Sequence, residues 1–141
     1  MMEVKAIIAD DEEPLRHSLK AMLSDLWPRL IVCGEAKNGR EALALIEEHK
    51  PDVVFLDIRM PGLTGMDVAR KIGAACWVVF VTAYDQYAVE AFENEAVDYL
   101  LKPVTPERLE KTVRRIEDKI TAHETPPAYA SLQADVMCGG D

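Results

Sequence analysis

A buried run that ends in a single carboxylate constrains the fold of this chain more than any other feature. The apolar residues Val53–Leu56 are followed directly by Asp57, and Pro61 and Gly62 then end the segment. Unbroken runs of Val and Phe with this length are typical of central strands in parallel sheets, which are covered on both faces. Ligands of such open sheets bind at the carboxyl ends of the strands. We therefore predict a parallel sheet with a functional site beside Asp57.

Further apolar runs alternate with amphipathic stretches along the chain. The pattern predicts strands over 4–9, 30–33, 53–56, 77–81 and 97–101, and helices over 14–27, 38–49, 64–73, 86–94 and 106–120. Strict alternation of this kind gives a parallel sheet with right-handed crossovers. We expect an α/β fold, a three-layer (βα)5 sandwich of the flavodoxin-like kind with the parallel strand order 2-1-3-4-5.

The helical periodicity stops shortly before the end of the sequence. A chain of 141 residues suits one domain. We expect that domain over residues 1–123 and a linker or disordered tail over residues 124–141, which contain Pro126-Pro127 and Gly139-Gly140.

Composition argues against several functional classes. The apolar runs are too short to span a membrane, and the N-terminus lacks the basic region and cleavage site of a signal peptide. Three cysteines without C-x-x-C spacing fit reduced thiols, so we expect a cytoplasmic protein. A formal net charge of −9 disfavours non-specific binding to nucleic-acid phosphates.

Chemically active side chains follow four of the five predicted strands. Asp10 and Asp11 follow the first, Asp57 the third, Thr82 the fourth and Lys102 the fifth. In the expected strand order the carboxylates would share one cleft, where unit charges about 4 Å apart repel by about 4 kcal/mol at an effective dielectric near 20. A hard divalent cation, Mg²⁺ above all, would relieve this repulsion. Taken singly, the Asp pair also fits helix capping and Lys102 a surface lysine.

The same groups suit phosphoryl transfer. Asp57 is a carboxylate that is already deprotonated at neutral pH and can attack in line without a general base. Lys102 would supply a positive charge and Thr82 a hydroxyl donor for the equatorial phosphoryl oxygens.

Four motifs in order resemble the receiver domain of bacterial two-component response regulators. They are Asp10-Asp11, Asp57 before Met60-Pro61-Gly62, Thr82-Ala83, and Lys102-Pro103. The resemblance spans residues 4–120 and implies that Asp57 is the phospho-acceptor for a sensor histidine kinase. It implies a signalling protein that catalyses only its own phosphorylation and dephosphorylation, and is not an enzyme for an external substrate.

The resemblance also implies the cofactor and its ligands. Side chains of Asp11 and Asp57 and the carbonyl of Arg59 would bind Mg²⁺ directly, whereas Asp10 would act largely through water. No other cofactor is implied.

Two more features follow from the same resemblance. Thr82 and Tyr99 match a switch pair whose hydroxyl and ring move together on phosphorylation. The Lys102–Pro103 peptide bond matches one that is cis in the family, a form that proline makes accessible.

One branch of the family is more similar than the others. The segments over residues 82–93 and 96–104 resemble receivers attached to LytTR-type DNA-binding domains. The chain would then be a fragment of a transcription regulator, with DNA bound only through a missing output domain; a single-domain receiver is the alternative. We see no helix-turn-helix or basic patch that could read DNA.

Charges on the last two predicted helices suggest a homodimer through the face formed by these helices, over 86–94 and 106–120, and the strand over 97–101. Helix four would be acidic and helix five basic, so a two-fold axis could set one against the other. The residues concerned are Glu90, Glu93, Glu95, Lys111, Arg114 and Arg115.

Other functions fit the sequence less well. Haloacid-dehalogenase-like phosphatases need a second Asp two residues after the nucleophile, where this chain has Arg59. A flavin mononucleotide module needs a hydroxyl- and Gly-rich loop after the first strand, but the acidic run over residues 10–13 would repel a phosphate. A receiver-like domain without phosphorylation is disfavoured because every acceptor-site residue is present.

Overall fold

The structure is a computed structural model of the 141-residue chain and describes residues 3–93 and 96–126. The strands are β1 (Val4–Ala9), β2 (Leu30–Ala36), β3 (Val53–Leu56), β4 (Trp77–Thr82) and β5 (Asp98–Leu101). The helices are α1 (Glu13–Leu26), α2 (Gly39–His49), α3 (Gly65–Ile72), α4 (Ala88–Glu93) and α5 (Pro106–Thr121). The strands pair in parallel in the order β2-β1-β3-β4-β5, which confirms the predicted fold.

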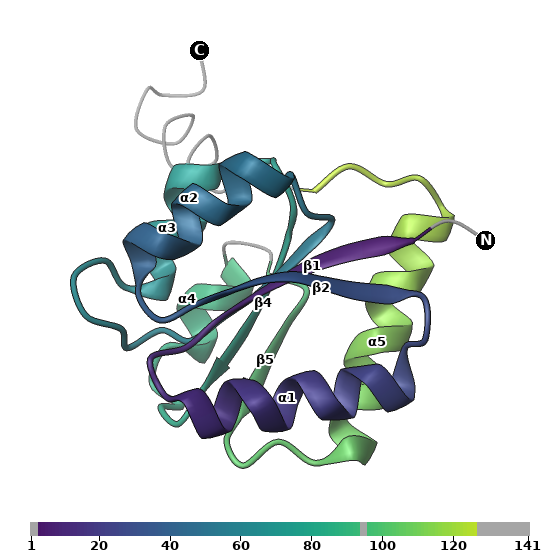
Figure 1. The fold of residues 1–141 in the computed structure, drawn as a ribbon, viewed down its shortest axis with the longest axis horizontal. Coiled ribbons are helices and arrows are strands. Elements are labelled where there is room, and N and C mark those ends of the chain that lie inside the picture. The colour runs from purple at the N-terminus through teal and green to yellow at the C-terminus, as the bar shows by residue number, and fades with distance from the viewer. Residues whose placement is uncertain (1–2, 94–95, 127–141) are drawn as a thin grey trace.

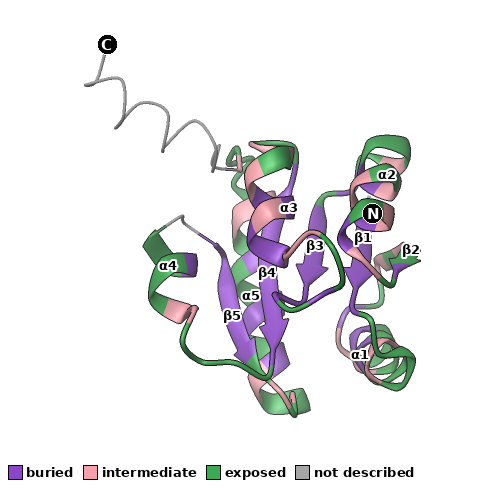
Figure 2. Ribbon diagram, turned by 90° about the vertical axis from the view of Figure 1, so that its left-hand side faces the viewer, coloured by how far each residue is buried: buried purple, intermediate pink, exposed green. Residues whose placement is uncertain are grey.

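The sheet is the middle of three layers. Figure 1 shows α1 and α5 on one face of the sheet and α2, α3 and α4 on the other. All four residues of β3 are buried, and they alternate between the two cores, with Phe55 packed on the α1 and α5 side and Leu56 on the opposite side. Figure 2 shows the same burial along the central strands. Coverage of both faces explains the continuous apolar run that marks β3 in the sequence.

The predicted end of the second strand, at residue 33, is wrong. β2 continues to Ala36, and its register shifts so that Ala6 pairs with Val32 but Ile7 pairs with Gly34. Cys33 is therefore an extra residue in the ladder, a bulge that lets the strand pass through Gly34 without ending there.

Smaller differences concern the ends of other elements. β4 includes Thr82, β5 begins at Asp98, and α4 begins at Ala88 instead of residue 86. The predicted end of the fourth helix at residue 94 lies outside the described residues.

Side-chain caps explain where two helices begin. The Thr64 side chain accepts a hydrogen bond from the amide of Asp67, whose carboxylate accepts from the amide of Thr64, so α3 begins with a capping box. At α2 the Asn38 side chain caps the amide of Glu41, but the carboxylate of Glu41 binds the amide of Lys37.

The chain leaves α5 at the C-terminal end of the described part. Residues 124–126 belong to no helix or strand, and the rest of the predicted tail, 127–141, lies outside the described residues. Among the described helices, none has the length and apolarity needed to cross a membrane.

Candidate functional site

The carboxyl edge of the sheet brings together the ends of β1, β3 and β5. The ammonium nitrogen of Lys102 lies 2.6 Å from a carboxylate oxygen of Asp10 and 2.8 Å from one of Asp57. Glu12 is further away, with its carboxylate 3.7 Å from the same nitrogen. The Asp57 and Lys102 side chains are 6% and 11% exposed. The expected repulsion between the acids is thus offset here by an ammonium ion that contacts both.

The sheet itself fixes these positions. The amide of Asp57 donates to the carbonyl of Ala9, and the amide of Lys102 donates to the carbonyl of Thr82, each at 2.9 Å. The amide of Asp10 continues the pairing with β2 in the same way. Asp10, Asp57 and Lys102 are therefore each the first residue beyond a strand, held by one more hydrogen bond of the ladder.

Burial and ion pairing act against each other on the titrating groups. Burial raises the pKa of Asp10 above its ordinary value, although Lys102 lowers it in part. Burial alone would lower the pKa of Lys102, but hydrogen bonds to Asp10 and Asp57 outweigh it and raise that pKa. Lys102 therefore carries its positive charge throughout the neutral pH range.

Carboxylate oxygens gather around the end of β1. Asp10, Asp11 and Glu12 each offer one oxygen, and these oxygens lie within 4.8 Å of one another. Asp10 is buried, whereas Asp11 and Glu12 are exposed. Such a set of hard oxygen donors fits Mg²⁺, which binds a few carboxylates and keeps several waters. The predicted metal set lacks Glu12, whose only sequence signal is its place in the acidic run.

The segment after β3 contributes backbone and an exposed cation. The amide of Arg59 donates to the second carboxylate oxygen of Asp57 at 3.2 Å. The guanidinium of Arg59 lies over the ring of Tyr84, 4.7 Å from its centroid. The side chain of Arg59 is thus directed to the segment after β4, while its backbone stays next to Asp57.

Thr82 and Tyr99 are both buried near this edge. Within the described residues, the hydroxyl of Thr82 is the one fully buried side-chain polar atom without a hydrogen-bond partner. Such an atom calls for an explanation, because an unsatisfied buried group costs about 1–3 kcal/mol. The Tyr99 hydroxyl donates to the carbonyl of Tyr84, and burial raises the pKa of Tyr99 to about 12. The ring of Tyr99 packs beside Phe80 at 6.2 Å between centroids.

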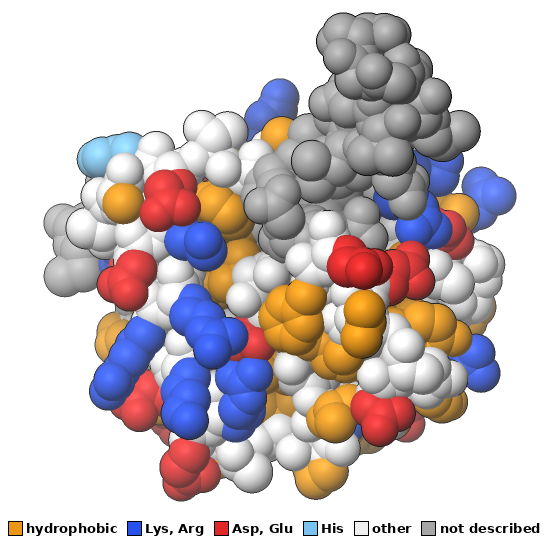
Figure 3. All heavy atoms as spheres, turned by 180° about the vertical axis from the view of Figure 1, so that it is seen from behind, with side chains coloured by type: hydrophobic (Ala, Val, Ile, Leu, Met, Phe, Trp, Pro, Cys, Tyr) orange, Lys and Arg blue, Asp and Glu red, His pale blue; other side chains and the backbone are white. Residues whose placement is uncertain are grey.

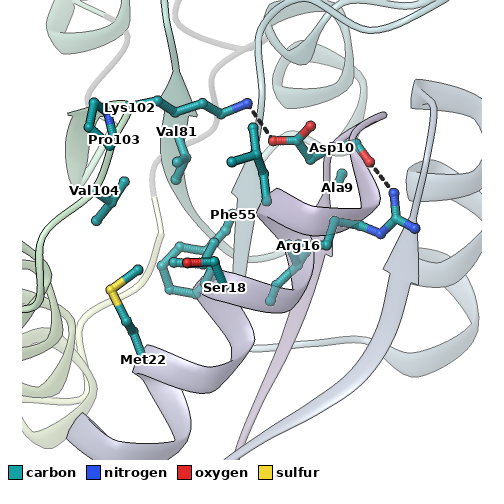
Figure 4. Close-up of a pocket in the computed structure, with 13 residues that line it drawn as sticks. Ala9, Asp10, Arg16, Ser18, Met22, Phe55, Val81, Lys102, Pro103 and Val104 are labelled. Carbon is teal, nitrogen blue, oxygen red and sulfur yellow. Dashed lines mark hydrogen bonds and ion pairs between the residues drawn. The ribbon is translucent and has the colours of Figure 1, made fainter.

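A small cavity adjoins the site on the α1 side. It has a volume of about 80 Å³ and lies between α1 and the segment after β5. Figure 4 shows Lys102 reaching from the far side of this cavity towards Asp10, with Pro103 and Val104 behind it. The peptide bond between Lys102 and Pro103 is cis.

The chain matches known proteins over most of its length. Residues 6–114 match the family described as response regulator receiver domain. An uncharacterized response regulatory protein of Vibrio cholerae is 48% identical over 124 residues, which cover 86% of this chain and 48% of the relative. The sensory transduction protein LytT of Oceanobacillus iheyensis is 40% identical over 125 residues, covering 85% and 50%. The chain therefore spans about half the length of these curated relatives.

A solved structure agrees with these relatives. The REC domain of AraT, a response regulator of Geobacillus stearothermophilus, matches this fold with a TM-score of 0.78 and 33% sequence identity. The alignment covers 86% of this chain and 98% of that chain. The family match, these relatives and the shared fold lead to one conclusion: the chain belongs to the response regulator receiver domain family, the phospho-acceptor signalling domain of two-component systems.

Proposed function

We propose that Asp57 is the phospho-acceptor of this receiver and takes its phosphoryl group from a sensor histidine kinase. The observation that carries the proposal is the contact of one buried ammonium, Lys102, with the carboxylates of Asp57 and Asp10 at distances of 2.8 and 2.6 Å. A nucleophile, further carboxylates and a fixed cation within one cleft are what phosphoryl transfer to an acid requires.

In the transfer step a carboxylate oxygen of Asp57 attacks the phosphorus of a phosphohistidine. The new P–O bond forms as the P–N bond breaks, and the imidazole of the kinase leaves with the electron pair. Lys102 exchanges a carboxylate partner for a phosphoryl oxygen, which keeps its charge paired. The Thr82 hydroxyl donates to another phosphoryl oxygen and so gains the partner that it lacks in this structure.

The acidic group Asp10, Asp11 and Glu12 beside the end of β1 offers oxygen ligands of the kind that Mg²⁺ binds. We propose that the side chains of Asp11 and Asp57 and the carbonyl of Arg59 hold the ion, with Asp10 acting through water. Bound there, Mg²⁺ would neutralise negative charge on the phosphoryl oxygens. Asp10 and Lys102 keep the acceptor carboxylate in place before the ion and the donor arrive.

Thr82 and Tyr99 form the proposed switch. Movement of the Thr82 hydroxyl towards a phosphoryl group would open space behind it, and Tyr99 would give up its hydrogen bond to the carbonyl of Tyr84 and repack its ring into that space. Signal transmission then requires that the Tyr99 side chain has two packing arrangements whose free energies differ by a few kcal/mol.

The output would act through the face formed by α4, β5 and α5. The side chains of Val89, Phe92 and Leu101 on this face are 70%, 50% and 48% exposed. Figure 3 shows exposed hydrophobic side chains next to a group of Lys and Arg side chains. We propose that this face forms a homodimer after phosphorylation.

Charges at this face have partners within the chain. Glu90 lies 3.4 Å from Arg70, and Arg115 lies 3.1 Å from Asp98. Glu95 lies outside the described residues. The apolar residues are therefore a better candidate for the centre of the dimer than the charge pairs, which would lie at its rim.

The larger protein is proposed by analogy with its relatives. We propose a receiver domain over 1–123 and a linker over 124–141, leading in the cytoplasm to a LytTR-type DNA-binding domain that controls transcription. The length of the relatives and the 40% identity to LytT support this assignment. The receiver would catalyse only its own phosphorylation and dephosphorylation.

An isotope-labelling experiment tests the acceptor. With Mg²⁺ and radiolabelled acetyl phosphate, the chain should take up acid-labile phosphate, and Asp57→Asn should abolish the uptake. Asp52→Asn is the matched control, because Asp52 precedes the same strand at its other end and its carboxylate binds the amide of Lys5. Stoichiometric labelling of the Asp57→Asn variant would contradict the proposal.

A further inference from the structure

Asp10 is restrained at every polar group that it has. Its carboxylate accepts from the amide of Glu12 at 2.9 Å and contacts Lys102 at 2.6 Å. Its own amide donates to the carbonyl of Ala36. Its carbonyl accepts a hydrogen bond from the guanidinium of Arg16 at 2.6 Å, shown as a dashed line in Figure 4. This last bond is made by a residue that the phosphoryl-transfer step does not use.

Arg16 is itself held in place by a second partner. Its Nε atom donates to the carboxylate of Glu35 at 3.3 Å, and its side chain is only 13% exposed. Glu35 lies near the end of β2, so one guanidinium joins α1, β1 and β2 at the carboxyl edge of the sheet. The planar fork of Arg suits such a two-point contact better than the single ammonium of Lys.

The bond from Arg16 acts on the peptide unit between Asp10 and Asp11. A peptide unit is planar, so fixing its carbonyl also fixes the direction in which the chain continues into Asp11. Asp11 is exposed and has no contact of its own comparable to those of Asp10 among the described interactions. The orientation of its carboxylate therefore depends on the backbone that Arg16 holds.

We propose that Arg16, oriented by Glu35, is a positioning residue that sets the affinity of the acidic cluster for Mg²⁺ by fixing the Asp10–Asp11 peptide. This inference rests on the proposed function, because it assigns Asp11 to the metal. It adds a residue to which neither the resemblance nor the phosphoryl chemistry gives a role.

Geometry and charge predict opposite results when Arg16 is removed. Loss of a cation near carboxylates would by itself strengthen the binding of Mg²⁺. Loss of the restraint on Asp11 would weaken Mg²⁺ binding. Mutation of a residue that orients a metal ligand typically lowers metal affinity by about 10–100-fold. A weaker affinity in a variant without Arg16 therefore identifies positioning as the dominant effect.

Calorimetric titration of the full chain with Mg²⁺, without a phosphoryl donor, measures this affinity. We expect Arg16→Ala to bind Mg²⁺ at least about tenfold more weakly, and Arg16→Lys, which keeps the charge but loses the fork, to lie between Arg16→Ala and the wild type. Lys20→Ala is the matched control, because Lys20 also pairs with Glu35, at 3.3 Å, from the same helix. That variant should bind Mg²⁺ as the wild type does.

An independent readout follows the backbone without the metal. Amide hydrogen exchange at Asp11 and Glu12 should become faster in Arg16→Ala and in Arg16→Lys, but not in Lys20→Ala. Wild-type affinity or tighter binding in Arg16→Ala, or unchanged exchange at both amides in Arg16→Lys, would overturn the inference. A wild-type chain that does not bind Mg²⁺ would contradict the proposed metal site, and this inference with it; a failure confined to the Arg16 variants would leave the proposed function standing.

Discussion

Lys102 is the residue on which the charge balance of the site depends. Its ammonium contacts Asp10 and Asp57 in this structure, so it occupies the place between the acids that a metal or phosphoryl group would share. A metal ion and the Lys102 ammonium group are attracted to the same carboxylates and therefore compete with each other. Lys102 is therefore expected to limit metal affinity before phosphorylation and to pair with the phosphoryl group after it.

Replacement of Lys102 by Ala should tighten Mg²⁺ binding roughly tenfold, about 1.4 kcal/mol. The reason is that the two carboxylates would lose their fixed counter-ion. The same variant should lose the conformational response to a phosphoryl mimic, because the switch would lack its cation. Calorimetry measures the affinity for Mg²⁺, and spectra of the backbone amides follow the conformational response. Lys119→Ala, which removes the same charge near the far end of α5, is the control; equal or weaker binding in Lys102→Ala would refute the competition.

Gly65 permits a close contact between α3 and the backbone of Asp57. A β-carbon at Gly65 would lie 2.4 Å from the carbonyl oxygen of Asp57, a contact that only a backbone shift could relieve. We expect Gly65→Ala to destabilise the fold by about 2–3 kcal/mol and to slow phosphorylation. Gly62→Ala, with a φ of 79° but no atom within 4 Å of the added carbon, should cost about 1 kcal/mol. Chemical denaturation measures how much unfolding free energy each variant loses. Equal losses in Gly65→Ala and Gly62→Ala would argue against the steric explanation.

At the scale of elements, the sequence predicts the order and type of every strand and helix, because burial on two faces and helical stripes leave distinct patterns. The helix caps at Thr64 and Asn38 can also be recognised from the sequence, because the residues that form each cap lie within four consecutive positions. The bulge at Cys33 is not visible, because it depends on the register between two strands. The contact of Lys102 with two acids is likewise a result of packing and not of spacing.

The link between β5 and α5 is another feature that the sequence does not reveal. Asp98 is fully buried and accepts hydrogen bonds from the guanidinium of Arg108 at 2.7 and 2.9 Å and from the Thr112 hydroxyl at 2.7 Å. Burial would raise the pKa of Asp98, but these hydrogen bonds outweigh it and hold the pKa below its ordinary value. The ion pair thus ties α5 to the strand that carries Tyr99.

The pKa of Asp98 predicts how the stability of the fold depends on pH. A lowered pKa in the folded state gives stability that is complete above the unfolded-state pKa, about 3.9, and is lost as the pH falls through the folded-state value. Asp98→Asn should therefore cost about 2 kcal/mol at neutral pH, and its difference from the wild type should shrink in acid. Urea unfolding over a pH series measures this, and a constant difference down to acidic pH would exclude the ion pair as the cause.

At the scale of the whole molecule, the proposed dimer depends on the exposed apolar residues of α4 and β5. With beryllofluoride bound as a phosphoryl mimic, the chain should sediment as a dimer, and Val89→Asp should keep it monomeric by placing a charge in the apolar centre. Ile31→Asp is the control, because Ile31 is also exposed but lies on β2, at the other edge of the sheet. A wild-type monomer at high protein concentration and low salt would contradict the dimer.

If Asp57 is the phospho-acceptor, no other acid of the cluster should receive the phosphoryl group. Borohydride reduces an acyl phosphate and converts the modified aspartate to homoserine, which sequencing of the digested chain locates. After incubation with acetyl phosphate and Mg²⁺, we expect homoserine at position 57 alone. Homoserine at Asp10 or Asp11, or at no position in a chain that has taken up phosphate, would contradict it.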